Sequence, residues 1–112
     1  MYITIRRYSI HPGSTLELVE RIRNSFVPLI SRASGFIAYY AVDEGDGDVS
    51  AVSIFVDEAS AEASNHLAAE WIMKNVAYLI SSPPKIIAGN VVAKCAGQIR
   101  SGDFSEMMET AA

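Results

Sequence analysis

Trp71 and Asn75 are the two residues of this 112-residue chain whose types and spacing most readily suggest chemistry. They lie four positions apart in a stretch with helical periodicity, so both fall on its apolar face, one turn apart. There, an indole N–H and a carboxamide could donate hydrogen bonds to an oxyanion that forms during a reaction. The commoner role of such side chains is to bond backbone groups, and Asn75 could in that way help to end the helix.

The first strand-like run, residues 2–8, carries a second group of candidates. Its side chains alternate, so one face holds Met1, Ile3 and Ile5 and the other holds Tyr2, Thr4, Arg6 and Tyr8. We expect the apolar face to lie under helices and the mixed face to look into a cavity or an interface. Arg6 could hold an anionic ring oxygen through charge-assisted hydrogen bonds. It is equally suited to an ion pair between subunits or at a strand edge.

Three other clusters favour ordinary surface roles. His66 shares a helix face with Glu62 and Glu70, but that face points to solvent by the same periodicity. The acidic segment 43–48 does not have the spacing of an EF-hand loop, so we predict a solvated turn and no metal site. Cys95 is the single cysteine, which excludes an internal disulfide, fits a reducing compartment and indicates a passive thiol.

Composition narrows the possible functions. A net charge of −4 argues against nucleic-acid binding, which favours basic surfaces. No run approaches the ~20 apolar residues of a membrane span, and the first residues do not resemble a secretory signal. No glycine-rich phosphate loop or metal-ligand spacing is visible, so no cofactor is predicted. These features lead us to expect a cytoplasmic protein that binds neither nucleic acid nor membrane.

The elements that must position the candidates follow from local signals. A capping box, Ser14 with Glu17, predicts the start of a helix that Pro28 should bend and Gly35 should end. Residues 36–42 and 49–56 are aromatic and β-branched runs joined by the acidic turn, which predicts a hairpin.

A second helix is expected from Asp57, as its cap, to about Ile80. A last strand is expected over residues 85–95, where Gly89 indicates a bulge or a close backbone approach. Two strand-helix-strand units joined by a hairpin give an α+β, ferredoxin-like β-α-β-β-α-β fold, with a four-stranded antiparallel sheet and both helices on one face.

The bare face of such a sheet would be apolar. Tyr39 and Tyr40 point to opposite faces, so both faces carry aromatic residues, and a soluble monomer rarely exposes a large apolar patch. The simplest cover is a second copy, sheet against sheet, which closes a dimeric α+β barrel with a cavity between sheet and helices. The sequence does not decide which tyrosine lines that cavity.

The order of several short motifs resembles a known family. These are PG at 12–13, GFIAY at 35–39, FVDEAS at 55–60 and PPK at 83–85. Together they are similar to the antibiotic-biosynthesis-monooxygenase-like domains of the dimeric α+β barrel superfamily. The likeness covers residues 1–95, which form the single expected domain. Residues 96–112 are a C-terminal extension, predicted to include a short helix that docks on the partner subunit.

The resemblance implies a homodimer and oxidation of a small aromatic, polyphenolic substrate by dioxygen without metal or flavin. On this hypothesis Arg6, Trp71 and Asn75 are the catalytic residues, and the substrate is contacted by Thr4, Tyr8, Tyr40 and Phe55.

The chain also departs from the family pattern. Where family oxygenases tend to carry an asparagine, a tryptophan and a further aromatic donor, it has Ala51, Phe55, and Ala61 or Ser64. Haem degradation is disfavoured, because this chain has Lys74 at the position where the haem-degrading members need a histidine. The alternative is a non-catalytic protein that binds a small apolar ligand in the same cavity.

Overall fold

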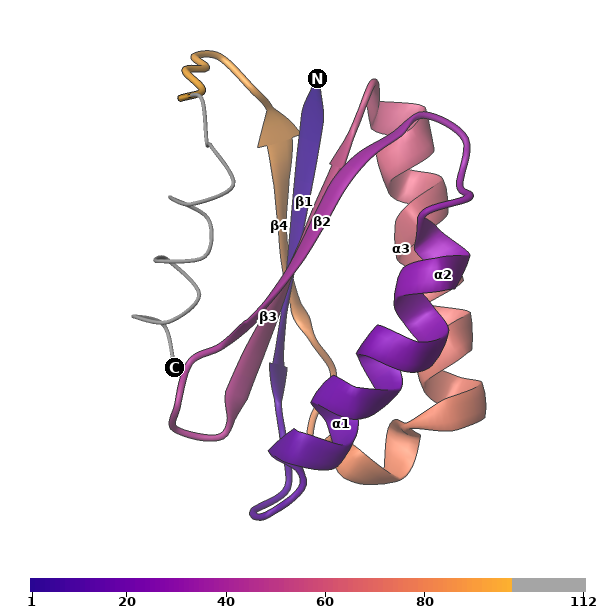
Figure 1. Cartoon of the computed structure of the whole chain (residues 1–112), viewed down its shortest axis with the longest axis vertical. Coiled ribbons are helices and arrows are strands. Elements are labelled where there is room, and N and C mark those ends of the chain that lie inside the picture. Colours follow the sequence, from indigo (N-terminus) through magenta and orange to yellow (C-terminus); the bar gives the residue numbers. More distant parts are fainter. Residues whose placement is uncertain (98–112) are drawn as a thin grey trace.

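The computed structural model describes residues 1–97, which form two layers, a four-stranded antiparallel sheet with helices on one face (Figure 1). The strands run in the order β2-β3-β1-β4, and their bounds are β1 (Tyr2–Ser9), β2 (Phe36–Asp43), β3 (Asp48–Phe55) and β4 (Lys85–Asn90). The two strands that begin and end the β-α-β-β-α-β order, β1 and β4, are neighbours, and β1 is central. The predicted ferredoxin-like fold is confirmed.

The two faces of β1 are reversed relative to the prediction. Thr4, Arg6 and Tyr8 are buried on the face that meets the helices. Ile3 and Ile5 lie on the bare face, where Ile5 pairs with Ile87 of β4. The prediction was wrong because it assumed that the apolar side chains of the strand would be the ones that pack against the helices. In the structure, the polar ones are satisfied there by hydrogen bonds to α3 and β3.

The first helical segment is continuous but changes its winding, as α1 (Thr15–Arg21), a π-helical turn η1 (Ile22–Phe26) and α2 (Val27–Ile30). In the π turn the Val27 N–H reaches the Ile22 carbonyl, five residues back. Pro28 follows directly and has no N–H for the Asn24 carbonyl, so the α-helical pattern is already interrupted there. The structure shows this wide turn near Pro28, and the predicted bend stays a prediction.

The predicted capping box is not formed. Ser14 is the residue before the helix and its carbonyl accepts from the Leu18 N–H at 3.1 Å, but its side chain makes no capping bond. Glu17 is engaged elsewhere, because its carboxylate accepts from the Tyr78 hydroxyl and lies 3.7 Å from Arg21. The position of the helix start was therefore correct and its mechanism was wrong.

Gly35 joins the first helical segment to the hairpin in a conformation that only glycine adopts easily. Its φ is +76°, and its carbonyl accepts from the Val56 N–H at 2.9 Å. A Cβ atom at this position would lie 2.6 Å from the Ser60 Oγ. The chain therefore needs glycine here both for the turn and for close packing against the start of α3.

A β-bulge at Ile37 sets which hairpin residues face the helices. Phe36 pairs with Phe55, and the next paired residue, Ala38, opposes Ile54, so Ile37 is the extra residue. The alternation expected from the sequence is shifted by one at this point. As a result Phe36 and Tyr39 lie on the same face, toward the helices, and Tyr40 points to the bare face.

The second helix, α3 (Glu58–Asn75), begins as predicted. Asp57 accepts a hydrogen bond from the Ser60 N–H at 2.8 Å, which lowers the pKa of the Asp57 carboxyl below its usual value. The helix ends at Asn75, earlier than the predicted Ile80, and a 3₁₀ turn, η2 (Ala77–Leu79), follows.

The last strand is shorter and more regular than predicted. It ends at Asn90, and Gly89 pairs with Ile3 without a shift of register, so there is no bulge. No atom lies within 4 Å of the place a Gly89 Cβ would occupy, so there is no close approach either. The docking helix predicted in the C-terminal extension lies outside the described residues, which include only residues 96 and 97 of that extension. Within residues 1–97 no helix has both the length and the apolar character to cross a membrane.

Candidate functional site

Arg6 is a buried cation in the middle of the central strand. Its side chain lies under α3, the residue is only 2% exposed, and it makes three hydrogen bonds. Nε donates to the Tyr8 hydroxyl at 3.2 Å, Nη1 to the Asn65 Oδ1 at 2.8 Å and Nη2 to the Ser53 Oγ at 3.2 Å. All three partners are neutral groups.

No carboxylate in residues 1–97 forms an ion pair with Arg6. The four ion pairs of this part of the chain use Arg7, Arg21 and Lys74 as cations, and all of these are exposed. The strand-edge ion pair considered for Arg6 is therefore not formed. Burying a cation without an anion is costly, and a guanidinium with five N–H groups and three neutral partners retains capacity for an anionic ligand.

Asn65 completes this polar group, and the sequence reasoning missed it. Its Oδ1 accepts from Arg6 and also from the Thr4 hydroxyl at 3.1 Å, which fixes the orientation of the carboxamide. Its Nδ2 donates no hydrogen bond within residues 1–97, and the residue lines the adjacent cleft. The available signal was the helical spacing of Asn65 with Ala68 and Ile72, which places it at the edge of the buried stripe.

A cleft of about 440 Å³ opens over Arg6, within the usual size range of small-molecule sites. Its walls come from β1, β4, the later half of α3, η2 and the loop before β4. They are mainly apolar, and are formed by Arg6, Tyr8, Asn65, Ala69, Ile72, Met73, Ala77, Ile80, residues 81–84 and Ile86. Arg6 and Asn65 are therefore polar donors at the side of an apolar cleft, which suits a flat ring with an anionic oxygen.

A second, much smaller hollow of about 20 Å³ lies deeper between sheet and helices. It shares Arg6, Tyr8, Ile72 and Ile80 with the cleft. Its other walls are Leu18, Ile22, Phe26, Tyr39, Val49, Ala51, Ala68 and Trp71. The hollow is too small for an aromatic substrate, so of these two spaces beside Arg6 only the cleft can take a ring.

Trp71 and Asn75 do not form a donor pair directed into the cleft. The Trp71 indole N–H donates to the Ser25 Oγ at 2.9 Å, and the Asn75 Nδ2 donates to the Trp71 carbonyl at 2.8 Å. Trp71 also packs against Phe26, with 5.2 Å between ring centroids. Both side chains thus make the bonds of helix-packing residues, and a catalytic role for either stays a prediction.

The structure places the four residues predicted to contact the substrate in different surroundings. Tyr8 lines the cleft, and Thr4 supports it through Asn65. Phe55 is fully buried in the core against Phe36, 5.8 Å between ring centroids, and lines neither space. Tyr40 is 60% exposed on the opposite face of the sheet, so the cavity-facing hairpin tyrosine is Tyr39.

Burial raises the pKa values of the two inward tyrosines further above neutral pH, so both phenols are protonated there. It raises the pKa of Tyr39 to about 12, and it also raises the pKa of Tyr8, where the Arg6 charge opposes the effect. Tyr8 accepts from Arg6 through its oxygen and has no acceptor for its own O–H among residues 1–97. Its hydroxyl is therefore available as a donor to a ligand oxygen.

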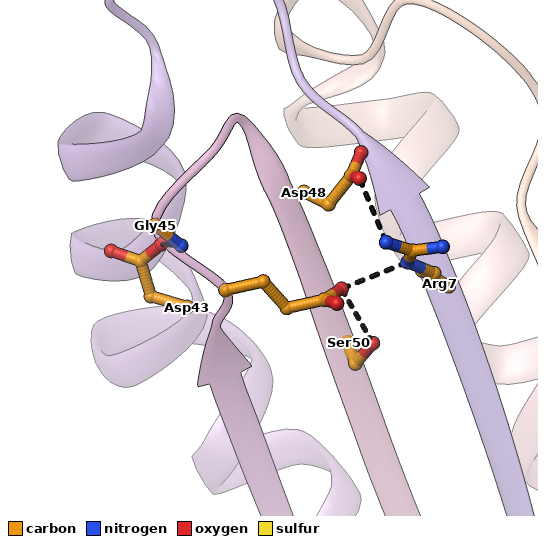
Figure 2. A network of polar contacts seen from close by, with 6 residues as sticks. Arg7, Asp43, Gly45, Asp48 and Ser50 are labelled. Atoms are coloured by element: carbon orange, nitrogen blue, oxygen red, sulfur yellow. Dashed lines mark hydrogen bonds and ion pairs between the residues drawn. The ribbon is translucent and has the colours of Figure 1, made fainter.

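The remaining candidate clusters lie elsewhere on the surface. His66, Glu62 and Glu70 are exposed, and Glu70 pairs with Lys74 at 2.6 Å. Within residues 1–97 there is no group of three potential metal ligands. Figure 2 shows the acidic turn, where the Gly45 N–H donates to Asp43 and Arg7 pairs with Asp48 at 3.0 Å.

Comparison with known proteins places the chain in a family. A model of the family described as antibiotic biosynthesis monooxygenase matches residues 1–69, more than half of the chain. The chain belongs to this family. No functionally curated protein matches the sequence.

Three solved structures show how the family fold is shared. A Nitrosomonas europaea protein of unknown function is 30% identical, with a TM-score of 0.72 over 87% of this chain and 94% of that one. A monooxygenase from the ActVA-Orf6 gene of Streptomyces coelicolor, in complex with nanaomycin D, is 16% identical, with a TM-score of 0.68 over 87% and 92%. MhuD, with two manganese protoporphyrin IX molecules per active site, is 17% identical, with a TM-score of 0.69 over 87% and 100%. The last two likenesses concern the fold alone.

The positions at which this chain departs from the family pattern lie in packed surroundings. Ala51, Phe55 and Ala61 are buried, and the Ser64 hydroxyl donates to the Ala61 carbonyl at 2.6 Å. None of them offers a donor to the cleft. The polar chemistry of this member is therefore concentrated on Arg6, Tyr8 and Asn65.

Proposed function

We propose that this protein is a monooxygenase that binds a small phenolic substrate as its anion in the cleft over Arg6. The observation that carries the proposal is the buried guanidinium with only neutral partners, at the wall of an apolar cleft of about 440 Å³. A phenolate oxygen would supply the missing anion, and the apolar walls would hold its ring. Family membership supports the oxygenase reaction.

Arg6, Asn65 and Tyr8 would bind the substrate oxygen and favour its ionised form. The phenolate then reduces dioxygen, a carbon–oxygen bond forms at the ring, and the O–O bond breaks as the ring C–H proton leaves. One oxygen atom becomes a quinone carbonyl, and the other leaves as water, which takes up the ring proton and the proton that the phenol released on ionising. The four electrons taken up by dioxygen all come from the substrate, so electrons and atoms balance. The protein contributes binding, orientation and electrostatic stabilisation.

The direct test measures whether anion binding depends on Arg6. Trp71 is the single tryptophan and borders the inner hollow, so its fluorescence reports on ligands in the cleft. An acidic hydroxynaphthoquinone should quench it saturably, and the neutral methyl ether of the same compound should bind about ten- to a hundredfold more weakly. The variant Arg6→Met should lose this preference for the anion. Arg7→Met, which changes the neighbouring exposed arginine, should retain it; equal affinities of wild type and Arg6→Met would overturn the proposal.

The oxygenase step is tested by following dioxygen consumption and quinone formation with a panel of hydroquinones and naphthols. Arg6→Met should slow the reaction and Arg7→Met should not. A second function, ligand binding without turnover, is favoured by the apolar residues at positions 51, 55 and 61 and by the engaged N–H groups of Trp71 and Asn75. Saturable binding with no dioxygen consumption across the panel would establish it.

The homodimer is also part of the proposal, and the bare face of the sheet supports it. Strand pairing gathers on that face an apolar patch of Ile3, Ile5, Ala38, Tyr40, Val52, Ile54 and Ile87. At the hairpin end the patch is bordered by a charged rim in which Arg7 pairs with Glu44 at 2.9 Å and Asp48 at 3.0 Å (Figure 2). An apolar centre with a polar rim is the anatomy of a protein interface.

A further inference from the structure

The small inner hollow has a shape and lining that the phenolic substrate does not explain. It measures about 20 Å³, and its walls are the aliphatic and aromatic side chains of α1, η1, α3 and the sheet. Arg6, Tyr8 and Tyr39 carry polar groups at its walls, but the surface that faces the hollow is almost entirely apolar. The indole N–H of Trp71 is directed to Ser25 instead.

Water is a poor occupant of such a space. A buried water molecule needs about 10–15 Å³ and two to four polar partners, so the hollow has the volume for one small molecule but not the hydrogen-bonding groups for water. Apolar cavities in proteins stay dry and take up apolar guests. A small apolar molecule is therefore the favoured occupant.

We propose that this hollow is a binding site for dioxygen, which is apolar and close to water in size. The inference rests on the proposed oxygenase function, because that reaction needs dioxygen next to the substrate ring. The hollow and the cleft share Arg6, Tyr8, Ile72 and Ile80, so a molecule in the hollow lies across a common wall from one in the cleft. The cleft thus holds the electron donor, and the hollow holds the acceptor.

Arg6 links the two sites electrostatically. It borders both spaces, so the negative charge that leaves the phenolate and develops on reduced oxygen stays beside the same guanidinium. No charged group has to move during the electron transfer. This is the preorganised arrangement that lowers the cost of a developing anion in a site of low dielectric.

The hollow is also bordered from the other side. It shares Ile22, Tyr39 and Val49 with an open groove between α1 and the hairpin, and that groove is also lined by Leu16, Val19 and Val27. Ile22, Tyr39 and Val49 are thus a wall between the hollow and this groove, on a side that a substrate in the cleft does not cover.

The first test uses dioxygen itself and does not depend on activity. Dissolved dioxygen is paramagnetic, so under oxygen pressure methyl groups beside a bound molecule relax faster in NMR spectra. We expect strong enhancement for the methyls of Ala51 and Ala68, which line the hollow, relative to Ala61 and Val76, which are as deeply buried elsewhere. Equal enhancement at all four would overturn the proposal.

The second test alters the hollow and the cleft separately through adjacent residues. Ala68 lines the hollow and Ala69 lines the cleft. Ala68→Leu should abolish the NMR enhancement and raise the KM for dioxygen at least about tenfold, with the affinity for the phenolic anion unchanged within about twofold. Ala69→Leu should weaken binding of the phenolic anion and leave the NMR enhancement of the methyl groups beside the hollow unchanged.

A third variant guards against misfolding of Ala68→Leu. Phe26→Leu enlarges the hollow without crowding it and should increase the NMR enhancement. A folded Ala68→Leu protein with an unchanged KM for dioxygen, or Phe26→Leu with no increase, overturns the dioxygen site while the oxygenase function stands. If no substrate is oxidised, the oxygenase function fails, and the NMR experiment alone still decides whether the hollow takes dioxygen.

Discussion

The indole N–H of Trp71 donates to the hydroxyl of Ser25 across 2.9 Å, and this bond joins α3 to the π-helical turn of the first helical segment. Trp71 is buried and Ser25 is an exposed residue. Ser25 belongs to the π turn, so the part of the segment interrupted near Pro28 supplies the acceptor for this bond. The bond thereby links the two helical segments that cover the sheet.

Replacing Ser25 by alanine should lower the free energy of unfolding by about 1 kcal/mol, the usual net value of such a hydrogen bond. Urea unfolding followed by Trp71 fluorescence measures it, and the native emission should also shift because the indole loses its acceptor. Ser34→Ala is the matched control, since Ser34 is exposed and makes no side-chain bond within the described chain. Equal stabilities of the two variants would show that the bond contributes nothing.

We expect replacement of Arg6 to reduce anion binding and activity strongly and to change the free energy of unfolding little. Its buried charge has no carboxylate partner in residues 1–97, so burying Arg6 carries a desolvation penalty that an apolar side chain of similar length would not have. Removing this penalty should offset the loss of the three hydrogen bonds. We expect Arg6→Met to change the free energy of unfolding by less than about 1 kcal/mol. Chemical denaturation measures this, and a loss of several kcal/mol would mean that Arg6 is a structural residue.

The glycines offer a graded test of backbone strain. Gly35 has φ +76° and would place a Cβ 2.6 Å from Ser60, Gly45 has φ +87° with open space around it, and Gly89 has neither restriction. We expect Gly35→Ala to be the most destabilising, Gly45→Ala to cost about 1–2 kcal/mol and Gly89→Ala to be close to neutral. Thermal unfolding of the three variants should reproduce this order. A stable Gly35→Ala protein would contradict the close approach seen at this residue.

The sequence predicted the element order, the hairpin, the Asp57 cap and the ferredoxin-like fold because these follow from local chemistry and hydrophobic period. It misassigned the faces of β1, because Thr4, Arg6 and Tyr8 are polar and their burial depends on partners far along the chain. Likewise the bulge at Ile37 leaves no mark in composition, yet it exchanged the places of Tyr39 and Tyr40. Asn65 was missed for the same reason: a polar residue on a helix edge becomes part of a site only through the strand opposite.

Burial of Tyr39 makes the free energy of unfolding vary with pH in the alkaline range. The pKa of Tyr39 is raised from 10.0 to about 12, so between these values the unfolded chain loses a proton that the folded chain retains. The unfolded state then binds fewer protons, and stability falls as pH rises. The contribution is complete below pH 10 and is lost as pH rises toward about 12.

Unfolding measured from pH 8 upward should therefore show a decline that begins near the ordinary pKa of tyrosine, 10.0. Tyr39→Phe should make the decline shallower, and Tyr40→Phe, which changes the exposed neighbour, should leave it as in wild type. The phenol absorbance of Tyr39, obtained by difference from the phenylalanine variant, gives the pKa directly. A value at the ordinary pKa would mean that Tyr39 is not buried in solution.

The apolar patch on the bare face makes the proposed dimer sensitive to a single charge. Ile87 is 70% exposed in the isolated chain and lies opposite Ile5 in the patch, so a glutamate there would be buried without a partner in a sheet-to-sheet dimer. Leu16 is 71% exposed on α1, away from this face, and serves as a control of equal exposure and similar chemistry. Sedimentation should show a dimer for wild type and Leu16→Glu, and a weakened or absent dimer for Ile87→Glu. If Leu16→Glu dissociates the protein instead, the subunits meet through the helical face, and the bare sheet is not the interface.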